Sequence, residues 1–356
     1  MIRRVAAAAG AGLLSVVAMR ALGGRASRRL LEAPRTTPDE DALGPALDAL
    51  GGEVVRLRAR DGVRLAGRWL PAEAGDSDWV TEPHEAILLL HGYTGSVAPD
   101  VVEYGPYLRR TAGLLALDFR GHGGSDEGPS TFGVLETEDI AGALAWLGGR
   151  GVTRVALVGT SMGGISAIAA VAVLGDGSLA AADMDPATPR HVHPVPRPRI
   201  VAVVADSVTP ELEIPIAARL SGPARRFVAA RLFDAAARTL GTDPRATEPA
   251  RVIGLVDPVP LLLIHGEADS TVPIAAGRRL AALAGPAAEH WVIAGAGHSG
   301  GHALVTAEYE RRTTDFLRMA IRAARADDAD TSDEGPIIDP PGPSAGTPIR
   351  AMPRED

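Results

Sequence analysis

The sequence contains neither cysteine nor lysine. The absence of cysteine excludes disulfide bonds, a cysteine nucleophile and thiolate metal ligands, although it does not fix the compartment. All 36 basic residues are arginine, and alanine and glycine are abundant, which indicates GC-rich coding rather than selection for guanidinium chemistry. The net charge of -8 argues against nucleic acid as the main partner.

The chain has the composition of one large globular domain, since its 356 residues are 46% hydrophobic and 22% charged. Its charges are unevenly placed. Residues 1–31 contain six arginines and no acid, whereas residues 326–356 contain eight acids and two arginines. Because the second segment is also rich in proline and nearly free of aromatics, we predict a disordered acidic tail over 326–356.

The first segment has the layout of a signal sequence, with a basic start and an apolar middle. Residues 5–19 form an uncharged run between Arg4 and Arg20. A membrane-spanning helix needs about 20 residues, so this run is short, and no good cleavage site follows it. We predict that residues 1–31 are a membrane anchor that is not removed. A cleaved export signal and an alanine-rich soluble helix are the alternatives.

The pattern of apolar residues after a predicted linker at 32–52 indicates an α/β fold. Residues 53–59 and 63–70 alternate around Asp61 and Gly62, which predicts a β-hairpin. Continuous apolar runs follow at 86–90, 113–117, 152–158, 200–204 and 259–264, as expected of parallel strands covered on both faces. Helical patterns lie at 135–149, 162–174, 274–284 and 303–325. We therefore predict a mostly parallel, doubly wound sheet of about eight strands with an antiparallel first hairpin.

Two insertions interrupt this alternation. Residues 175–199 contain five prolines and are predicted to be a surface loop, in which His191 and His193 lack a third metal ligand nearby. Residues 209–257 are helical in pattern and lie between two strands, where a lid would cover the carboxyl ends of the sheet.

A serine lies in a sharp turn between a strand and a helix. Gly159, Ser161 and Gly163 form a G-x-S-x-G pattern between the strand at 152–158 and the helix at 162–174. This is the context of a nucleophile elbow, in which a tight turn presents the serine hydroxyl at the end of the strand.

A serine nucleophile needs a base, and the base needs a carboxylate to hold its tautomer. Asp269 follows the run at 259–264, with Glu267 as the second candidate, and His298 follows the short strand ending near residue 293. His302 is the rival for the base. The order serine, aspartate, histidine is the one used in this architecture.

These three motifs, with residues 91–95 and 118–125, resemble those of the α/β-hydrolase fold family over about residues 53–324. The similarity is greatest to serine-aminopeptidase-like and monoacylglycerol-lipase-like hydrolases, which include membrane-anchored members. The resemblance implies a catalytic domain over 53–325 with Ser161 as nucleophile, His298 as general base and then acid, and Asp269 as its orienting acid. It also implies an oxyanion hole formed by the backbone N–H groups of Tyr93 and Met162, with the Tyr93 ring lining an acyl pocket. It implies no metal and no organic cofactor.

The resulting hypothesis is a serine hydrolase that cleaves a small-molecule acyl ester, or secondarily an amide, through an acyl-enzyme. Acyl transfer to an alcohol or amine is an alternative, and a catalytically inactive, membrane-tethered binding protein is another. The remaining polar candidates are assigned structural roles. We expect His91, His122 and His265 to hold loops, and Glu138 and Asp139 to be solvated or to cap a neighbouring loop.

Overall fold

The computed structural model describes residues 25–32, 40–74, 78–93, 95–175, 197–286 and 288–333. Residues 5–19, His191 and His193 lie outside the described part, as does the predicted tail beyond residue 333. Among the described residues, no helix combines the length and apolarity needed to cross a bilayer.

The described chain forms one eight-stranded sheet in the order β1-β2-β4-β3-β5-β6-β7-β8. The strands are β1 Glu53–Arg58, β2 Arg64–Leu70, β3 Glu85–Leu90, β4 Gly113–Leu117, β5 Arg154–Thr160, β6 Arg199–Asp206, β7 Leu261–Gly266 and β8 Ala288–Ile293. β1 and β2 form the predicted antiparallel hairpin, and β2 also pairs antiparallel with β4. All other pairs are parallel, which confirms the predicted fold class.

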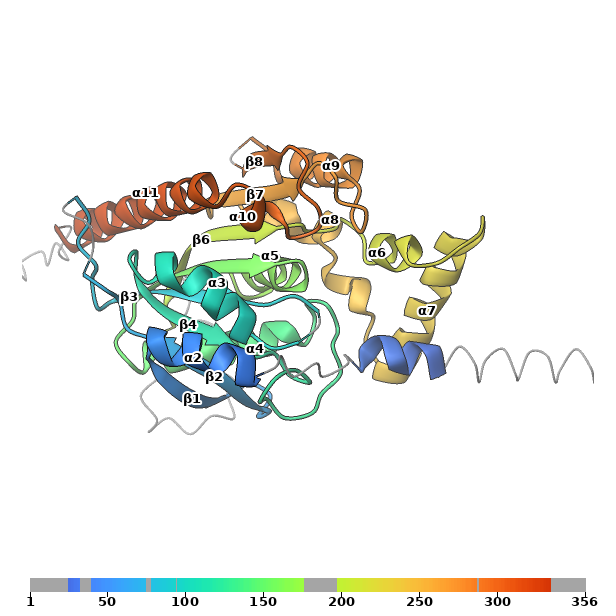
Figure 1. Ribbon diagram of the computed structural model, residues 1–356, viewed down its shortest axis with the longest axis horizontal. Coiled ribbons are helices and arrows are strands. Elements are labelled where there is room, and N and C mark those ends of the chain that lie inside the picture. Colours follow the sequence, from blue (N-terminus) through green and yellow to red (C-terminus); the bar gives the residue numbers. More distant parts are fainter. Residues whose placement is uncertain are drawn as a thin grey trace, which may run out of the picture.

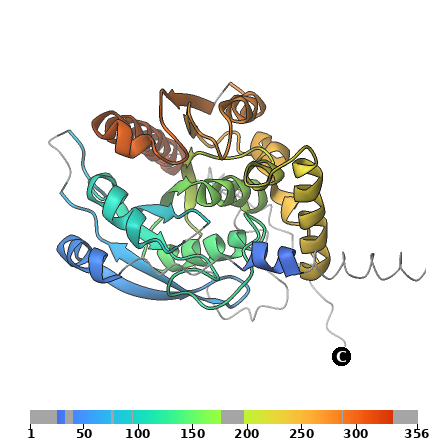
Figure 2. The same ribbon diagram turned by 45° about the vertical axis from the view of Figure 1, so that its right-hand side comes forward.

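Helices cover both faces of the sheet (Figures 1 and 2). One apolar core lies under α4 Glu136–Gly148, α5 Met162–Leu174 and α9 Ile274–Ala284. A second core lies under α2 Glu40–Leu50, α3 Ala98–Leu108 and α11 Thr306–Asp333, and α10 Gly301–Leu304 precedes α11. β3 and β4 are buried along their whole length because both cores contact them.

The helical insertion predicted at 209–257 follows β6. It contains α6 Glu213–Ala218, α7 Arg225–Leu240 and α8 Pro249–Val252, with 3-10 turns at Pro244–Thr247 and Ile253–Leu255. α6 and α7 form an arm beyond the carboxyl ends of the strands (Figure 1). We expected Leu220, Phe227, Leu232 and Phe233 to face the sheet or a pocket. Phe233 is buried, but Phe227 is 61% exposed, so the expectation is wrong for Phe227.

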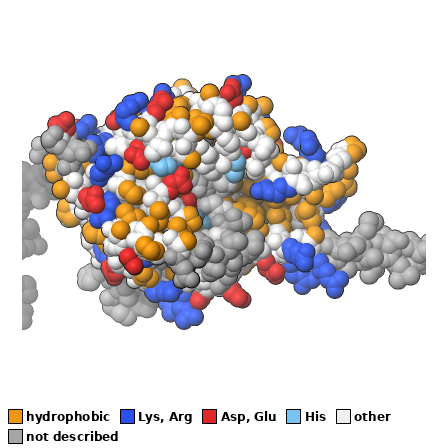
Figure 3. All heavy atoms as spheres, in the orientation of Figure 1, with side chains coloured by type: hydrophobic (Ala, Val, Ile, Leu, Met, Phe, Trp, Pro, Cys, Tyr) orange, Lys and Arg blue, Asp and Glu red, His pale blue; other side chains and the backbone are white. Residues whose placement is uncertain are grey.

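The outer surface of this arm carries both arginine and hydrophobic side chains (Figure 3). Arg231 lies over the exposed ring of Phe227, 5.0 Å from its centroid. The short helix of residues 25–31 lies near the far end of α7, where Leu31 and Leu240 line one cavity of about 550 Å³. The N-terminal end of the described chain therefore starts beside the arm.

Two predicted boundaries differ from the structure. The segment at 32–52, expected to be a linker, contains helix α2, whose Leu47 is buried in the second core. The segment from residue 326, expected to be disordered, is helical as far as Asp333, where α11 ends. Two of its acids are paired there: Asp327 with Arg199 at 2.8 Å and Asp328 with Arg154 at 2.6 Å. Neutralisation by arginines of two strands allows this acidic stretch to remain helical.

Candidate active site

Ser161 lies at the turn between β5 and α5, with φ 49° and ψ −112°. The turn requires glycine nearby because a Cβ on Gly163 would collide with the Leu90 carbonyl, and one on Gly159 would collide with the Gly163 backbone. The Ser161 N–H donates to the Asp206 carbonyl at 2.8 Å, which ties the turn to β6. The local sequence therefore folds as the predicted elbow.

Three side chains predicted from separate motifs form a series in which His298 contacts both Ser161 and Asp269. His298 Nε2 is 3.0 Å from Ser161 Oγ, and His298 Nδ1 is 2.7 Å from Asp269 Oδ2. With Nδ1–H directed at the carboxylate, Nε2 is left to accept the serine proton. Each residue follows the carboxyl end of a strand, β5, β7 or β8, so the parallel sheet brings them together.

The Asp269 side chain is fully buried and held by backbone groups. Its Oδ1 accepts hydrogen bonds from the N–H groups of Thr271 and Val272, both at 2.8 Å. Burial alone would raise the pKa of Asp269, but the hydrogen bonds from His298, Val272 and Thr271 outweigh it and lower the pKa below its usual range. The carboxylate is therefore ionised at neutral pH and oriented toward the imidazole.

The predicted oxyanion-hole residues are Tyr93, which follows Gly92, and Met162, which follows Ser161. Met162 is the first residue of α5, where helix N–H groups have no intrahelical acceptor. Gly92 lies next to Ser161, since a Cβ on it would be 3.8 Å from Ser161 Cβ. The Tyr93 hydroxyl donates to the Leu30 carbonyl at 2.5 Å. Tyr93 therefore follows a residue that lies against Ser161, and Met162 follows Ser161 itself in the chain.

The other candidates from the sequence lie elsewhere. Glu267 is exposed, whereas His302 contacts Glu103 at 2.9 Å and Glu310 at 3.3 Å. The His302 ring also packs against Tyr104, Tyr107 and Tyr309, away from the serine. The structure therefore does not bring His302 to the site as an alternative base.

The histidines predicted to be structural are held by backbone groups. His91 Nε2 accepts from the Phe119 N–H at 3.1 Å, and burial lowers the pKa of His91 to about 3. His122 contacts the carbonyls of Tyr93 and Arg120, and His265 donates to the Val272 carbonyl. His265 thereby supports the turn that orients Asp269.

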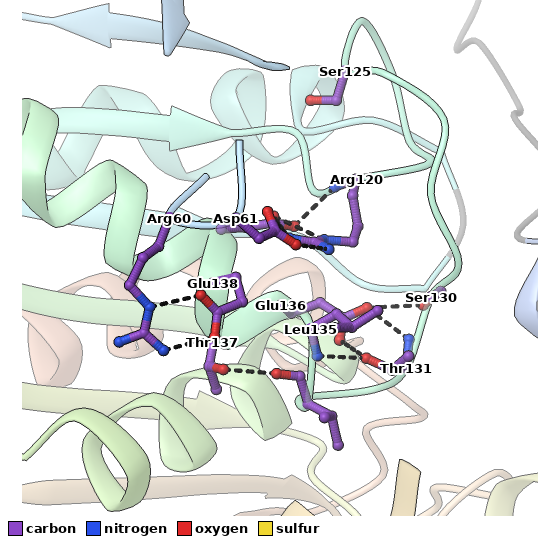
Figure 4. Close-up of polar contacts among 12 residues, drawn as sticks. Arg60, Asp61, Arg120, Ser125, Ser130, Thr131, Leu135, Glu136, Thr137 and Glu138 are labelled. Carbon is purple, nitrogen blue, oxygen red and sulfur yellow. Dashed lines mark hydrogen bonds and ion pairs between the residues drawn. The ribbon is translucent and has the colours of Figure 1, made fainter. Parts of the chain in front are cut away.

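The start of α4 contains a polar network that the sequence analysis largely missed (Figure 4). The buried Glu136 carboxylate accepts from the Thr131 N–H at 2.8 Å, the Thr131 hydroxyl at 2.7 Å and the Gly133 N–H at 2.8 Å. It thereby closes the loop of residues 130–133, in which Phe132 has φ 56°. Phe132 packs against Tyr93 and Phe233, so this loop links the serine region to the arm.

Glu138 and Asp139 differ in how far they are buried and in the arginine with which each pairs. Glu138 forms two hydrogen bonds to Arg60 and is partly exposed. Asp139, for which solvation or capping was expected, is fully buried and pairs with Arg120 at 2.7 Å, and Arg120 also contacts Asp61. Asp139 also accepts the Arg120 backbone N–H, so it caps the neighbouring loop but is not solvated. The sequence signal that could have indicated this network is the group of acidic residues in the first turn of the predicted helix.

Comparison of the sequence with known proteins identifies the family to which this chain is similar. Residues 87–311, more than half of the chain, match the model of the alpha/beta hydrolase family. The Escherichia coli K12 protein YfhR is 26% identical over 250 residues, covering 69% of this chain and 72% of its own. The Mycobacterium tuberculosis H37Rv protein Rv2307c is 27% identical over 277 residues, which cover 76% of this chain and 80% of Rv2307c.

Solved structures agree on the fold. The chain is similar to esterase Pf2001 of Pyrococcus furiosus, with TM-score 0.57, 22% identity, and coverage of 82% of this chain and 98% of that one. An alpha-beta hydrolase from Vibrio vulnificus has TM-score 0.59 at 19% identity, with 84% and 93% covered. The eight-stranded sheet, the strand-end serine and the family match lead to one conclusion: the chain belongs to the alpha/beta hydrolase family.

Proposed function

We propose that the protein is a serine hydrolase that cleaves carboxylic esters through an acyl-enzyme. The observation that carries the proposal is the continuous hydrogen-bonded series Ser161–His298–Asp269 at the carboxyl edge of the sheet. The esterase name of the similar Pyrococcus furiosus structure favours an ester over an amide. A small-molecule acyl ester is the proposed substrate class.

The proposed chemistry begins with attack of Ser161 Oγ on the ester carbonyl carbon while His298 Nε2 takes the hydroxyl proton. The negative charge on the carbonyl oxygen is stabilised by the N–H groups of Tyr93 and Met162. Collapse breaks the ester C–O bond, and the imidazolium gives its proton to the departing alcohol. Water then attacks the acyl-enzyme with His298 again as base, releasing the acid and restoring the serine. Asp269 stabilises the imidazolium throughout.

A fluorophosphonate probe and a panel of p-nitrophenyl esters test this proposal. The probe is expected to label wild-type protein stoichiometrically at Ser161, the Ser161→Ala variant is expected to stay unlabelled, and only the wild type is expected to turn over esters. Labelling without ester turnover would contradict the ester assignment. An unlabelled wild type would favour the inactive binding protein instead.

Acyl transfer uses the same acyl-enzyme, with a bound alcohol or amine in place of water. The arm at 209–257 motivates this alternative because water exclusion decides which acceptor reacts. Product analysis with added alcohols distinguishes the two: an ester product at low alcohol concentration indicates transfer.

We also propose that residues 5–19 hold the enzyme at a membrane. The support is the uncharged apolar run between Arg4 and Arg20 in the sequence. By the positive-inside rule, the nearly balanced flanking arginines favour a cytoplasmic catalytic domain only slightly.

A further inference from the structure

A second buried carboxylate lies beneath the proposed catalytic residues. Asp206 is the last residue of β6, in the sheet next to the serine-bearing β5, and is 2% exposed. Its backbone carbonyl accepts the Ser161 N–H at 2.8 Å. The backbone of Asp206 is thus already part of the turn that presents the serine.

The Asp206 side chain is connected to the loop that carries the base. Its Oδ1 accepts from the Ser207 hydroxyl at 2.8 Å, and its Oδ2 accepts from the Tyr309 hydroxyl at 2.9 Å. Ser207 Oγ in turn accepts the Ser299 N–H at 2.8 Å. Since Ser299 directly follows His298, only one hydroxyl group lies between the carboxylate and the backbone of the base loop.

Both serines of this connection have strained backbones. Ser207 has φ 57° and Ser299 has φ 51°, in the left-handed region that non-glycine residues seldom occupy. Such conformations persist where surrounding contacts hold them. The hydrogen bond between Ser207 and Ser299 joins the two strained positions, and Asp206 fixes the direction of the Ser207 hydroxyl.

We propose that Asp206 is a positioning residue for the base: through Ser207 it holds the His298 loop so that Nε2 faces Ser161, and its charge favours the imidazolium that forms during acyl transfer. This inference rests on the proposed serine-hydrolase function. Asp269 orients the imidazole ring directly, whereas Asp206 acts on the backbone beside it. Tyr309 of α11 anchors the arrangement from the second core.

The electrostatic surroundings are consistent with this role. Burial raises the pKa of Asp206 above its usual value, and the hydrogen bonds from Ser207 and Tyr309 and the nearby His265 and His298 offset only part of the rise. Both hydrogen-bond partners donate, as an ionised carboxylate requires. Tyr104 and Tyr107 of α3 face the same region. His298 itself is faced by Asp269 after β7 and by Ser161 after β5.

The test measures full-length variants by the rate of fluorophosphonate labelling and by kcat, KM and pH profile on a p-nitrophenyl ester. Ser207→Gly removes the hydroxyl and relieves the positive φ, so the variant is expected to fold. We expect labelling rate and kcat to fall about 10- to 100-fold with KM unchanged, because small misplacement of a base is costly. Asp206→Asn is expected to show the same loss, and also to move the acidic limb of kcat/KM to lower pH, since a negative charge that favours the imidazolium is lost.

The matched controls are two tyrosine variants from one aromatic cluster. Tyr309→Phe removes a hydrogen bond to Asp206 and should lower kcat by a smaller factor. Tyr107→Phe removes a buried hydroxyl without touching that bond and should leave kcat unchanged. Equal effects of the two variants would contradict a specific role for the Asp206 contact.

A folded Ser207→Gly protein with the labelling rate and kcat of the wild type would overturn the proposal. If Asp206→Asn does not fold, the Ser207→Gly variant alone decides the test. An Asp206→Asn protein with reduced kcat but an unshifted acidic limb would overturn the charge contribution. If the wild type is labelled but cleaves no ester, the ester function fails and the labelling rates still test Asp206. An unlabelled wild type would overturn both.

Discussion

Ser161 has a backbone conformation that costs a non-glycine residue about 1–3 kcal/mol. Close packing around the turn holds this conformation. A Cβ on Gly163 would collide with the Leu90 carbonyl, and the Ser161 N–H donates to β6. The result is a hydroxyl held 3.0 Å from an imidazole nitrogen. Side-chain chemistry at this position therefore depends on backbone packing of β3, β5 and β6.

The three hydrogen-bonded residues should act as a unit. Ser161→Ala, Asp269→Asn and His298→Ala are each expected to lower kcat by ~10³ or more, and double variants should be little worse than single ones. His302→Ala, which loses contacts to Glu103 and Glu310, should keep most activity. Steady-state measurement of kcat for all of these variants on one ester checks the prediction. Activity in His298→Ala together with its loss in His302→Ala would show that the base is misassigned.

The lowered pKa of Asp269 has a consequence for acid stability. Because its pKa is lower folded than unfolded, its ionisation stabilises the fold above the unfolded value, about 3.9, and this contribution is lost as pH falls through the folded value. The difference in melting temperature between wild type and Asp269→Asn should therefore shrink below about pH 4. Thermal unfolding of both proteins between neutral and acidic pH checks this, and a constant difference would contradict it.

Glu136 should be far more important for stability than Glu138, two residues along the same helix. Glu136→Ala would leave buried hydrogen-bond donors of Thr131 and Gly133 unpaired, so we expect a loss of about 3 kcal/mol or more in the free energy of unfolding. Glu138→Ala removes a partly exposed ion pair and should cost about 1 kcal/mol or less. Denaturant unfolding measures both, and equal losses would rule out this assignment of the network.

At the scale of elements, the apolar runs predicted the sheet well because parallel strands are buried on both faces. The linker prediction for 32–52 is wrong over α2 because it relied on prolines and glycines, which are poor helix formers: Pro34, Pro38, Pro45, Gly51 and Gly52. Leu43, Leu47 and Leu50 nevertheless follow helical spacing and pack in the second core. Burial of this apolar face outweighs the local preference, and a test of periodicity in that segment would have found the helix.

The two phenylalanines of α7 allow a direct test of the arm. Phe233 is 1% exposed and contacts Phe132, whereas Phe227 is 61% exposed. Phe233→Ala should cost about 3–5 kcal/mol in stability through lost burial, and Phe227→Ala about 0.5 kcal/mol or less. Denaturant unfolding compares the two variants. Similar losses would mean that the arm does not pack on the loop of residues 130–133 in solution.

At the scale of the whole molecule, the residues of the candidate site divide by how local their signals are. The elbow, the Asp269 loop and the His298 loop each have a short sequence pattern with glycine or a turn residue, and the order of the three patterns along the chain carried the prediction. Asp206 and Glu136 have no such pattern. Tyr309, one of the two hydrogen-bond partners of the Asp206 side chain, lies 103 residues away in the sequence. The packing of α11 on β6 brings Tyr309 to Asp206. Contacts of this kind require the assembled fold.

The position of the enzyme relative to a membrane is a property of the full chain. Residues 5–19 are apolar and uncharged, and the short helix of residues 25–31 lies beside α7. We expect the full chain to fractionate with membranes and to retain its N-terminus in intact-mass measurement. Deletion of residues 5–19 retains residues 25–32, with the contacts of Leu30 to Tyr93 and of Leu31 to Ser130, so this variant should become soluble with unchanged kcat. A full chain that is soluble with an intact N-terminus would contradict the anchor and the export signal alike. A soluble product starting near Gly23 would instead indicate cleavage.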